Sequence, residues 1–463
     1  MLIVEIPYRD PFAAFQAFAA DPRCAFLDSA AEGDVRSRWS YIGTDPYAFL
    51  TSGPDGVRID GSRVPGTPFE VLARMLAADA LPPSDGPVPF VGGAMGYFGY
   101  ELGRHLERLP QPRAGHPPVP EMSVGFYDTI LAFDRQARRG FIVSTGRPAA
   151  GAEEEARAKR RADALLTRLE AAPAEAPAPD LRRTGAFAPD QPRGDVEAAV
   201  ARTIEYIRAG DIFQANITHQ MRAPMPEGLS DLDLYARLRR ISPSPFAAFL
   251  RAGPDLSVLS ASPERFLSLS ADGRVETRPI KGTRRRSPDP AEDARLAAAL
   301  LASEKDRAEN LMIVDLLRND LSRVSRVGSV KVPVLCALET FASVHHLVSV
   351  VESRLEAGLG PVDLLKACFP GGSITGAPKI RAMEIIHELE PAPRGVYCGS
   401  IGWIGFDGAM DSSIVIRTIT RVGDTLLTQA GGGIVADSDP ADEYEESLIK
   451  LSPMLRALSG DAP

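Results

Sequence analysis

Short runs of alternating or continuously apolar residues recur along this 463-residue chain, and such runs are typical of β-strands. They occur on both sides of a polar stretch near residue 175, so strands are expected in both parts of the chain. The expected strands are 24–29, 38–43, 122–134, 140–144, 211–221, 246–250, 256–260, 265–269, 400–406, 412–421 and 425–430.

Longer segments have apolar residues three and four positions apart, which is the spacing of a helix with one buried face. This spacing predicts helices at 69–78, 152–171, 195–210, 231–241, 291–323, 380–389 and 437–450. Repeated strand pairs among long helices favour an α+β fold over the alternating βαβ order of a parallel sheet.

The stretch AAPAEAPAPD (171–180) interrupts the pattern. Its Ala/Pro composition cannot bury a core and is typical of an extended linker. We therefore divide the chain into an N-terminal region (1–147), a charged helix followed by the linker (148–192), and a C-terminal region (193–456). The C-terminal region carries nearly all of the unusual local chemistry.

Composition excludes several classes of function. An apolar content of 44% and a charged content of 24% are ordinary for a globular protein. The net charge of −9 argues against a nucleic-acid-binding protein. The four cysteines form no CxxC pair, which fits a reduced, cytoplasmic protein. We see neither a secretory leader nor an apolar run of about 18 residues, so no membrane association is expected.

The strongest candidate for a reactive side chain is Lys281, in the stretch ETRPIKGTRRR (276–286). Gly282 allows close backbone approach, and three arginines follow at once. A lysine near other cations has a lowered pKa, so its free amine becomes available as a nucleophile. Taken alone, however, the stretch is more typical of a solvated basic turn.

Two predicted helices carry carboxylates that could hold a metal ion. Glu309 points along an apolar stripe of its helix, and a carboxylate beside a core needs a cation or a hydrogen-bonded partner. Glu446 belongs to an acidic helix near residue 440. One Glu from each helix, with waters and a substrate oxygen, would suit Mg²⁺. The alternatives are a salt-bridged carboxylate at Glu309 and a solvated Glu446–Lys450 pair.

Two glycine-rich turns and one arginine are candidates for binding anions. The turn GGSITGAPK (371–379) leads into a helix whose first N–H groups can hold a carboxylate. The turn AGGGI (430–434) allows close backbone approach. Arg417, in a predicted strand, would be costly in a core without an anion to meet. Glu264 follows another strand and is either a general acid or a turn residue.

Together these stretches resemble the chorismate-utilising enzymes related to anthranilate synthase component I. The resemblance implies an α+β fold in which two large antiparallel β-sheets pack as a sandwich flanked by helices, with the active site between them. The matching motifs are collinear and cover residues 195 to 452: SPERF (262–266), RPIKGTRRR (278–286), AENLMIVDLLRNDL (308–321), VHHLVS (344–349), PGGSITGAPKIRAMEII (370–386), IGWIGFDGAMDSSIVIRT (401–418) and AGGGIVADSDPADEYEESLIKL (430–451).

Within this family the residue at position 281 separates two activities. Anthranilate synthase large components carry PIAGT, with alanine where this chain has Lys281. The form PIKGT resembles the branch that aminates chorismate at C4 for 4-aminobenzoate and folate synthesis. There the lysine adds to C2 while the C4 hydroxyl leaves, and ammonia then attacks C4. The resemblance implies this activity; the alternatives are anthranilate synthesis and a non-catalytic tryptophan-binding subunit.

The resemblance also implies roles for individual residues. Lys281 would be the nucleophile, Glu264 the acid that assists departure of the hydroxyl, and Glu309 and Glu446 the Mg²⁺ ligands. The positions expected around the substrate are His346, Thr375, Tyr397, Arg417, Gly431 and Lys450.

The resemblance implies partners as well. No glutaminase signature occurs, so ammonia is expected from a separate glutamine amidotransferase subunit. FLDS (26–29) and RWSYIG (38–43) resemble segments that line a tryptophan pocket, which is regulatory in anthranilate synthases.

Overall fold

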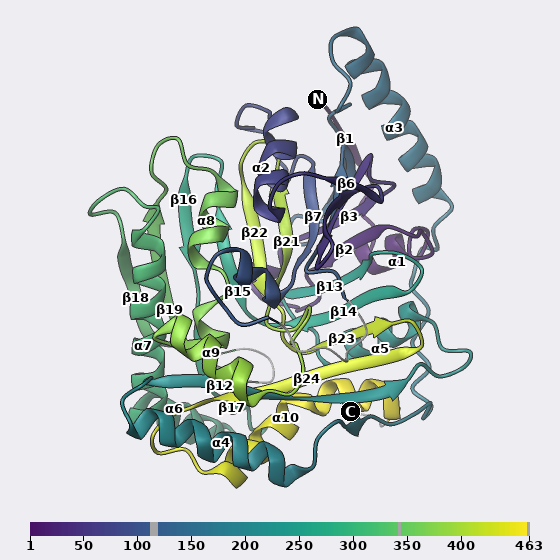
Figure 1. The fold of residues 1–463 in the computed structure, drawn as a ribbon. Helices are drawn as coiled ribbons and strands as arrows, with labels where there is room; N and C mark the ends of the chain where they lie inside the picture. The colour runs from purple at the N-terminus through teal and green to yellow at the C-terminus, as the bar shows by residue number, and fades with distance from the viewer. Residues whose placement is uncertain (112–118, 341–343, 461–463) are drawn as a thin grey trace.

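The computed structural model describes residues 1–111, 119–340 and 344–460. In this part of the chain, two twelve-stranded antiparallel sheets form the fold, which confirms the expected class (Figure 1). Sheet A runs in the order β1 (Leu2–Ile6), β10 (Arg139–Ser144), β9 (Thr129–Asp134), β3 (Trp39–Thr44), β2 (Cys24–Asp28), β13 (Phe246–Arg251), β14 (Leu256–Ser262), β23 (Thr418–Val422), β24 (Thr425–Ile434), β12 (Gln214–Pro224) and β11 (Ala188–Pro189), with β20 (Gly376–Ala377) also beside β12.

Sheet B runs in the order β17 (Ile280–Arg285), β19 (Val344–Arg354), β16 (Arg274–Thr277), β15 (Arg265–Leu269), β22 (Met410–Ile414), β21 (Ser400–Gly405), β7 (Gly93–Phe98), β8 (Met122–Tyr127), β4 (Ala48–Gly53), β5 (Gly56–Ile59) and β6 (Ser62–Val64), with β18 (Lys331–Thr340) also beside β19.

Helices flank the sheets, and α10 packs on β24 while α7 packs on β19. Side-chain caps fix where both begin: Ser303 accepts from the Asp306 N–H at α7, and Asp439 caps α10. None of the described helices is long and apolar enough to cross a membrane. The helices are α1 (Pro11–Phe15), α2 (Pro68–Ala78), α3 (Ala152–Glu170), α4 (Arg193–Arg208), α5 (Asp231–Ile241), α6 (Pro290–Ala302), α7 (Glu304–Ser322), α8 (Pro361–Cys368), α9 (Lys379–Leu389) and α10 (Pro440–Ser459), with short 3-10 turns η1 (Val35–Ser37), η2 (Tyr100–His105) and η3 (Gly372–Ile374).

Both sheets take strands from both sides of the linker. In sheet A, β2 pairs with β13, which places Phe26 opposite Phe249. In sheet B, β7 pairs with β21. The sheets therefore do not divide at residues 148–192. We keep this boundary only as a proposed division of the sequence.

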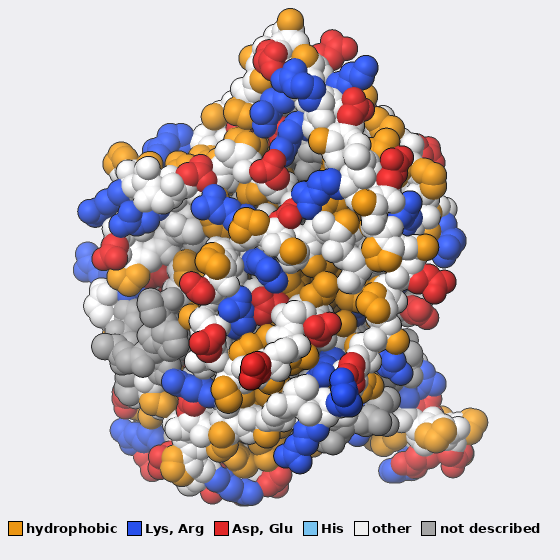
Figure 2. All heavy atoms as spheres, turned by 90° about the vertical axis from the view of Figure 1, so that its right-hand side faces the viewer, with side chains coloured by type: hydrophobic (Ala, Val, Ile, Leu, Met, Phe, Trp, Pro, Cys, Tyr) orange, Lys and Arg blue, Asp and Glu red, His pale blue; other side chains and the backbone are white. Residues whose placement is uncertain are grey.

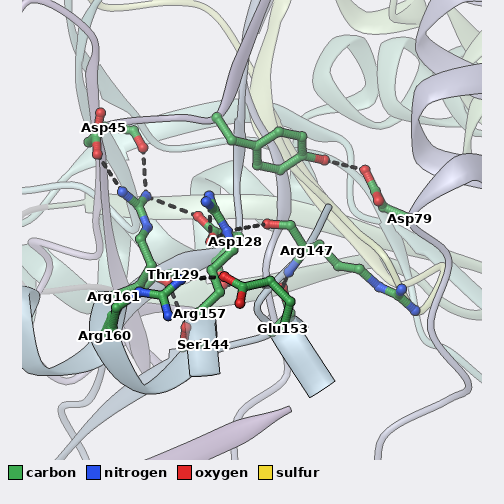
Figure 3. A network of polar contacts seen from close by, with 12 residues as sticks. Asp45, Asp79, Asp128, Thr129, Ser144, Arg147, Glu153, Arg157, Arg160 and Arg161 are labelled. Carbon is green, nitrogen blue, oxygen red and sulfur yellow. Dashed lines mark hydrogen bonds and ion pairs between the residues drawn. The ribbon is translucent and has the colours of Figure 1, made fainter. Parts of the chain in front are cut away.

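The charged helix predicted before the linker is α3, which projects at the upper right of Figure 1. Arg161 and Arg157 of α3 lie 2.9 and 3.1 Å from the carboxylate oxygens of Asp128, which is fully buried (Figure 3). A buried charge is tolerated when it is paired in this way. Figure 2 shows the face with α3 at its top, where acidic and basic side chains intermingle as on a solvated surface.

The strands predicted at 122–134 and 412–421 are wrong as single strands, because each is two strands in different sheets. In 122–134, β8 ends at Tyr127 in sheet B and β9 begins at Thr129 in sheet A. β22 ends at Ile414 in sheet B, and β23 begins at Thr418 in sheet A. Arg417, between them, has a left-handed φ of 53°, which breaks an extended strand. Apolar residues continue on both sides because each half is buried in its own sheet, so the pattern alone could not reveal the crossing.

Candidate active site

Some of the predicted site residues lie together where β17 of sheet B meets the β12–β24 end of sheet A, whereas Arg417 and His346 line a cavity whose wall does not include Lys281. The partly buried Lys281, on β17, donates from Nζ to the Ser373 carbonyl at 3.4 Å. A Cβ added to Gly433 of β24 would lie 3.4 Å from Lys281 Nζ and 1.8 Å from Nε2 of Gln214. The lysine amine therefore lies close to the main chain of Gly433, beside the amide of Gln214.

Burial is the main influence on the pKa of Lys281, which is lowered from its ordinary value. Lys450 lowers the pKa further, whereas the carboxylates of Glu309, Glu264 and Glu446 act in the opposite direction. The Lys281 amine therefore interacts electrostatically with all four of these side chains. A buried amine of lowered pKa is more readily neutral and nucleophilic.

The arginines after Lys281 do not act on it as the sequence suggested. Arg284 pairs with Asp306 at 3.1 Å, and Arg286 pairs with Asp293 at 2.8 Å. Their charges are therefore neutralised locally, and desolvation of the amine takes the role that we assigned to them.

Glu264 lies between β14 and β15 and is 6% exposed. Burial raises the pKa of its carboxyl to about 7, although a hydrogen bond from Ser373 and the charge of Lys281 lower it. Near neutral pH a large fraction of this carboxyl is protonated. The arrangement therefore places a proton donor beside the amine, as general acid catalysis requires.

Helices α7 and α10 carry Glu309 and Glu446, which interact electrostatically with Lys281, and α10 also carries Glu443. Burial raises the pKa of Glu309, on α7. On α10, Glu446 pairs with Lys450 at 2.8 Å, and Glu443, which is 8% exposed, lies 3.8 Å from Lys305. The sequence analysis missed Glu443, although its position one helical turn before Glu446 was a usable signal.

The carboxylates offer oxygen donors but no complete metal cage. Within residues 1–111, 119–340 and 344–460, no group of three or more His, Cys, Asp or Glu side chains is arranged to hold a metal ion. Glu309 and Glu446 nevertheless face one amine, and Mg²⁺ commonly takes one or two protein carboxylates and completes its shell with water and substrate. The two residues fit an ion of that kind.

The glycine-rich turns bring backbone groups close together. A Cβ at Gly431 would lie 1.9 Å from the Ile217 carbonyl, and the Gly431 carbonyl accepts from Lys450 Nζ at 2.8 Å. Thr375 is fully buried and its hydroxyl donates to the Gly371 carbonyl at 2.9 Å. The main chain at Gly431 and at Thr375 therefore lies close to neighbouring groups of the candidate site.

Lys379, the last residue of the candidate anion-binding turn at 371–379, contacts α7 and the end of α8. Its Nζ donates to Asp320 of α7 at 2.6 Å and to the Cys368 carbonyl at 2.9 Å. It therefore fastens α9 to α7 and has a carboxylate partner already.

Arg417 and His346 line a cavity of about 730 Å³ together with Thr283. Burial lowers the pKa of Arg417, and Tyr397 is the side chain that opposes this shift. In the part of the chain that the structure describes, no acidic side chain pairs with Arg417. Burial and the charges of Arg36 and Arg417 lower the pKa of His346 to about 4, and its Nδ1 lies 2.8 Å from the Thr283 hydroxyl.

Three residues that contact this site were not singled out from the sequence. Ser373 contacts both Lys281 and Glu264, and Gln214 is 1% exposed with an Oε1 that has no hydrogen-bond partner among the described residues. Alternate polar positions in QANITHQ (214–220) could have indicated a polar inner face of β12. Glu443 is the third.

The segments that resemble a tryptophan pocket are neighbouring strands. FLDS ends β2 and RWSYIG forms β3, and the two strands pair directly. A cavity of about 440 Å³ opens beside them, lined by Ser29, Trp39 and Trp403 among others.

Comparisons with known proteins agree with this arrangement. The model of the chorismate binding enzyme family matches residues 24–456. Aminodeoxychorismate synthase component 1 of Klebsiella aerogenes is 41% identical over 463 residues, covering 98% of each chain. Anthranilate synthase component 1 of Streptomyces coelicolor is 40% identical over 458 residues, covering 97% of this chain and 86% of that protein.

A solved structure is also similar to this chain over most of its length. The crystal structure of anthranilate synthase component I from Streptococcus pneumoniae TIGR4 superposes with a TM-score of 0.80 at 32% identity, covering 91% of this chain and 93% of that chain. Because the family model and these relatives span nearly the whole length, the chain belongs to the chorismate-binding enzyme family.

Proposed function

We propose that this protein aminates chorismate at C4 to give 4-amino-4-deoxychorismate, for 4-aminobenzoate and folate synthesis. The observation that carries the proposal is that Lys281, a partly buried amine of lowered pKa, and Glu264, a carboxyl with a pKa of about 7, interact electrostatically and both contact Ser373. The 41% identical aminodeoxychorismate synthase component 1 supports it.

In the first step Lys281 Nζ forms a bond to C2 of chorismate. The C1=C2 and C5=C6 double bonds shift to C1=C6 and C4=C5, and the C4–O bond breaks. Glu264 gives its proton to the departing oxygen, so that water leaves and the carboxylate remains. The lysine nitrogen keeps the positive charge of the adduct, and the nearby carboxylates stabilise it.

In the second step ammonia forms a bond to C4. The double bonds shift back, the C2–N bond breaks, and Lys281 leaves as a neutral amine. The Glu264 carboxylate takes the proton that the new C4 ammonium group loses, which restores the acid for the next turnover. A covalent intermediate thus divides one difficult displacement into two easier ones.

Glu309 and Glu446 would hold Mg²⁺, because they are the carboxylates of two different helices that act on the same amine. The ion would supply a positive charge that offsets the ring carboxylate of the substrate. Lys450, which pairs with Glu446, would lie beside the ion and the substrate.

The remaining predicted residues would orient the substrate, which carries two carboxylates. Arg417 lacks a described acidic partner and lies beside Tyr397, so this pair would bind one carboxylate. The close-packed backbone at Thr375 and Gly431, with Lys450 next to it, would bind the other. His346, at the wall of the cavity with Arg417, would lie beside the ring.

Ammonia would come from a separate glutamine amidotransferase subunit, or from free ammonium in its absence. Tryptophan would bind in the cavity beside β2 and β3, where aromatic side chains such as Trp39 and Trp403 provide flat apolar walls. The four cysteines are free and buried, which favours a reducing compartment such as the cytoplasm.

Anthranilate synthesis is the second candidate, because the Streptomyces coelicolor anthranilate synthase component 1 is 40% identical. Overall identity therefore does not separate the two activities. Lys281 does, because an alkyl amine at this position can add to C2 itself and so direct ammonia to C4.

The test is to incubate the protein with chorismate, Mg²⁺ and ammonium and to identify the product by chromatography and mass spectrometry. We expect 4-amino-4-deoxychorismate. Anthranilate as the product would refute the proposal in favour of the second candidate. Tight tryptophan binding without turnover would instead favour a non-catalytic subunit.

A further inference from the structure

A buried ion pair lies behind the positions that we assign to the substrate carboxylates. Glu390 and Arg394 follow α9 and are 6% and 3% exposed. Arg394 donates from Nε to Glu390 Oε2 at 2.9 Å and from Nη2 to Oε1 at 2.7 Å, which is a bidentate contact. A buried ion pair alone is weak evidence of stabilisation, so its other contacts indicate what it does.

The guanidinium of Arg394 also joins two backbone segments of the site. Nη1 donates to the Ile374 carbonyl at 2.7 Å, and Nη2 donates to the Asn216 carbonyl at 2.5 Å. Ile374 directly precedes Thr375, whose carbonyl in turn accepts from the Asn216 N–H at 2.8 Å. One side chain therefore fixes the turn that carries Thr375 against β12.

The carboxylate of Glu390 fixes the same strand two residues further on. Its Oε1 accepts from both the N–H and the hydroxyl of Thr218 at 2.8 Å. Thr218 lies opposite Gly431 in the β12–β24 ladder. The ion pair thus sets the position of β12 beneath both Thr375 and Gly431.

The N-terminal region holds the ion pair from the other side. The carboxylate of Glu101, in η2, accepts from the N–H groups of Arg394 and Gly395 at 2.9 and 3.0 Å. The ring of Tyr100 lies 4.6 Å from the Arg394 guanidinium, within cation–π range. Tyr397 follows Arg394 by three residues, so these contacts fix the start of the segment that carries Tyr397.

We infer that Glu390 and Arg394 form a positioning pair that keeps the Thr375, Gly431 and Tyr397 segments in the arrangement that binds the substrate carboxylates. The inference rests on the function proposed above. Among the described contacts, neither side chain bonds to Lys281 or Glu264, so the pair acts on substrate binding and not on the reacting atoms.

Two variants test the pair. Arg394→Lys keeps the charge opposite Glu390 but cannot make all four hydrogen bonds, and Glu390→Gln keeps the shape but loses the charge. Loss of charge-assisted hydrogen bonds should raise the KM for chorismate, and the dissociation constant measured by calorimetry, by about tenfold or more. The KM for ammonium should stay at the wild-type value, and bound chorismate should still form the Lys281 adduct.

Arg161→Lys is the matched control, because Arg161 also pairs with a buried carboxylate, that of Asp128, but on α3 (Figure 3). We expect it to lower the melting temperature without changing the affinity for chorismate. Arg394→Lys should lower the affinity even under conditions in which the two variants are equally folded.

Wild-type affinity for chorismate in folded Arg394→Lys, or equal loss of affinity in Arg161→Lys, would overturn the inference. Should Arg394→Lys fail to fold, Glu390→Gln decides alone, and unchanged affinity there contradicts the pair's role. Failure of the proposed function is a separate result: wild-type protein would make no 4-amino-4-deoxychorismate, while calorimetry would still report whether the pair controls chorismate binding.

Discussion

At the scale of single residues, burial outweighs charge in shifting the pKa values of Lys281 and Glu264, the two groups that we propose to react. Burial lowers the pKa of Lys281 and raises that of Glu264 to about 7, although the charge of each favours the ionised form of the other. Desolvation disfavours every charged form, so both groups are driven toward neutrality. A neutral amine beside a protonated carboxyl is the pair that the first step needs.

The buried acid should cost the protein stability as pH rises. The pKa of Glu264 is higher in the folded protein, about 7, than the 4.5 of an unperturbed carboxyl, so the folded state binds the extra proton between these values. The stabilisation that the Glu264 carboxyl contributes is therefore fully present below pH 4.5, and it is lost as the pH rises through 7. Relative to wild type, Glu264→Gln should gain about 3 kcal/mol in free energy of unfolding between pH 4 and pH 8.

Urea denaturation of both proteins at pH 4, 6 and 8 measures this gain. A difference between variant and wild type that is the same at all three pH values would contradict the burial of the acid. The variant should at the same time lose turnover, because glutamine cannot protonate the C4 oxygen.

The sequence indicated which side chains could react more clearly than it indicated what surrounds them. Lys281 and Glu264 could be singled out only from the collinear motifs taken together, because each alone also fits a turn. The sequence did not indicate the direction in which each side chain points. Lys379 stands among candidate anion-binding residues in the sequence, yet it turns away to Asp320, and Arg284 turns to Asp306. Such choices depend on partners distant in sequence.

At the scale of elements, α7 and α10 matter because each delivers a carboxylate to Lys281. Glu446 on α10 pairs with Lys450 at 2.8 Å, whereas its equally exposed neighbour Glu445 pairs with Arg193 at 2.6 Å. Successive residues on a helix point in different directions, so neighbouring carboxylates have different surroundings. Glu445 is therefore a control position for Glu446 on the same helix.

Glu446→Gln should raise the Mg²⁺ concentration for half-maximal activity by about tenfold or more, because one of two charged ligands is lost. Glu445→Gln should leave that concentration at the wild-type value. Mg²⁺ titrations of turnover at saturating chorismate measure both. Equal responses from the two variants would refute the assignment of Glu446.

Element ends were predicted closely only where the sequence marks them locally. Residues 231–241 form α5 with the predicted ends, because a capping box at Ser230 and a change of pattern at Ser242 mark both boundaries locally. The segment 412–421 had no such local mark. Its division depends on the left-handed φ at Arg417 and on the partners of each half, which lie in different sheets.

At the scale of the whole molecule, the two sheets unite the parts of the chain that the linker separates. Because β13 pairs with β2 and β21 pairs with β7, neither the N-terminal nor the C-terminal strands complete a sheet alone. Edge strands left unpaired would expose main-chain N–H and C=O groups. The Glu101 contacts to Arg394 extend the same dependence to the candidate active site.

Scanning calorimetry of the full chain should therefore show a single unfolding transition, with calorimetric and van't Hoff enthalpies that agree. The reason is that loss of either set of strands removes the hydrogen-bonding partners of the other. Two resolved transitions, one for each side of the linker, would contradict this reading and favour separate domains.

The central claim is that Lys281 becomes covalently attached to the substrate. The most direct measurement is the intact mass of the protein after incubation with chorismate and Mg²⁺ without ammonia, for wild type and for Lys281→Ala. We predict that wild type gains the mass of chorismate less one water, that ammonium discharges this adduct, and that Lys281→Ala gains nothing. An unchanged adduct in Lys281→Ala, or none in wild type that makes 4-amino-4-deoxychorismate, would contradict the account.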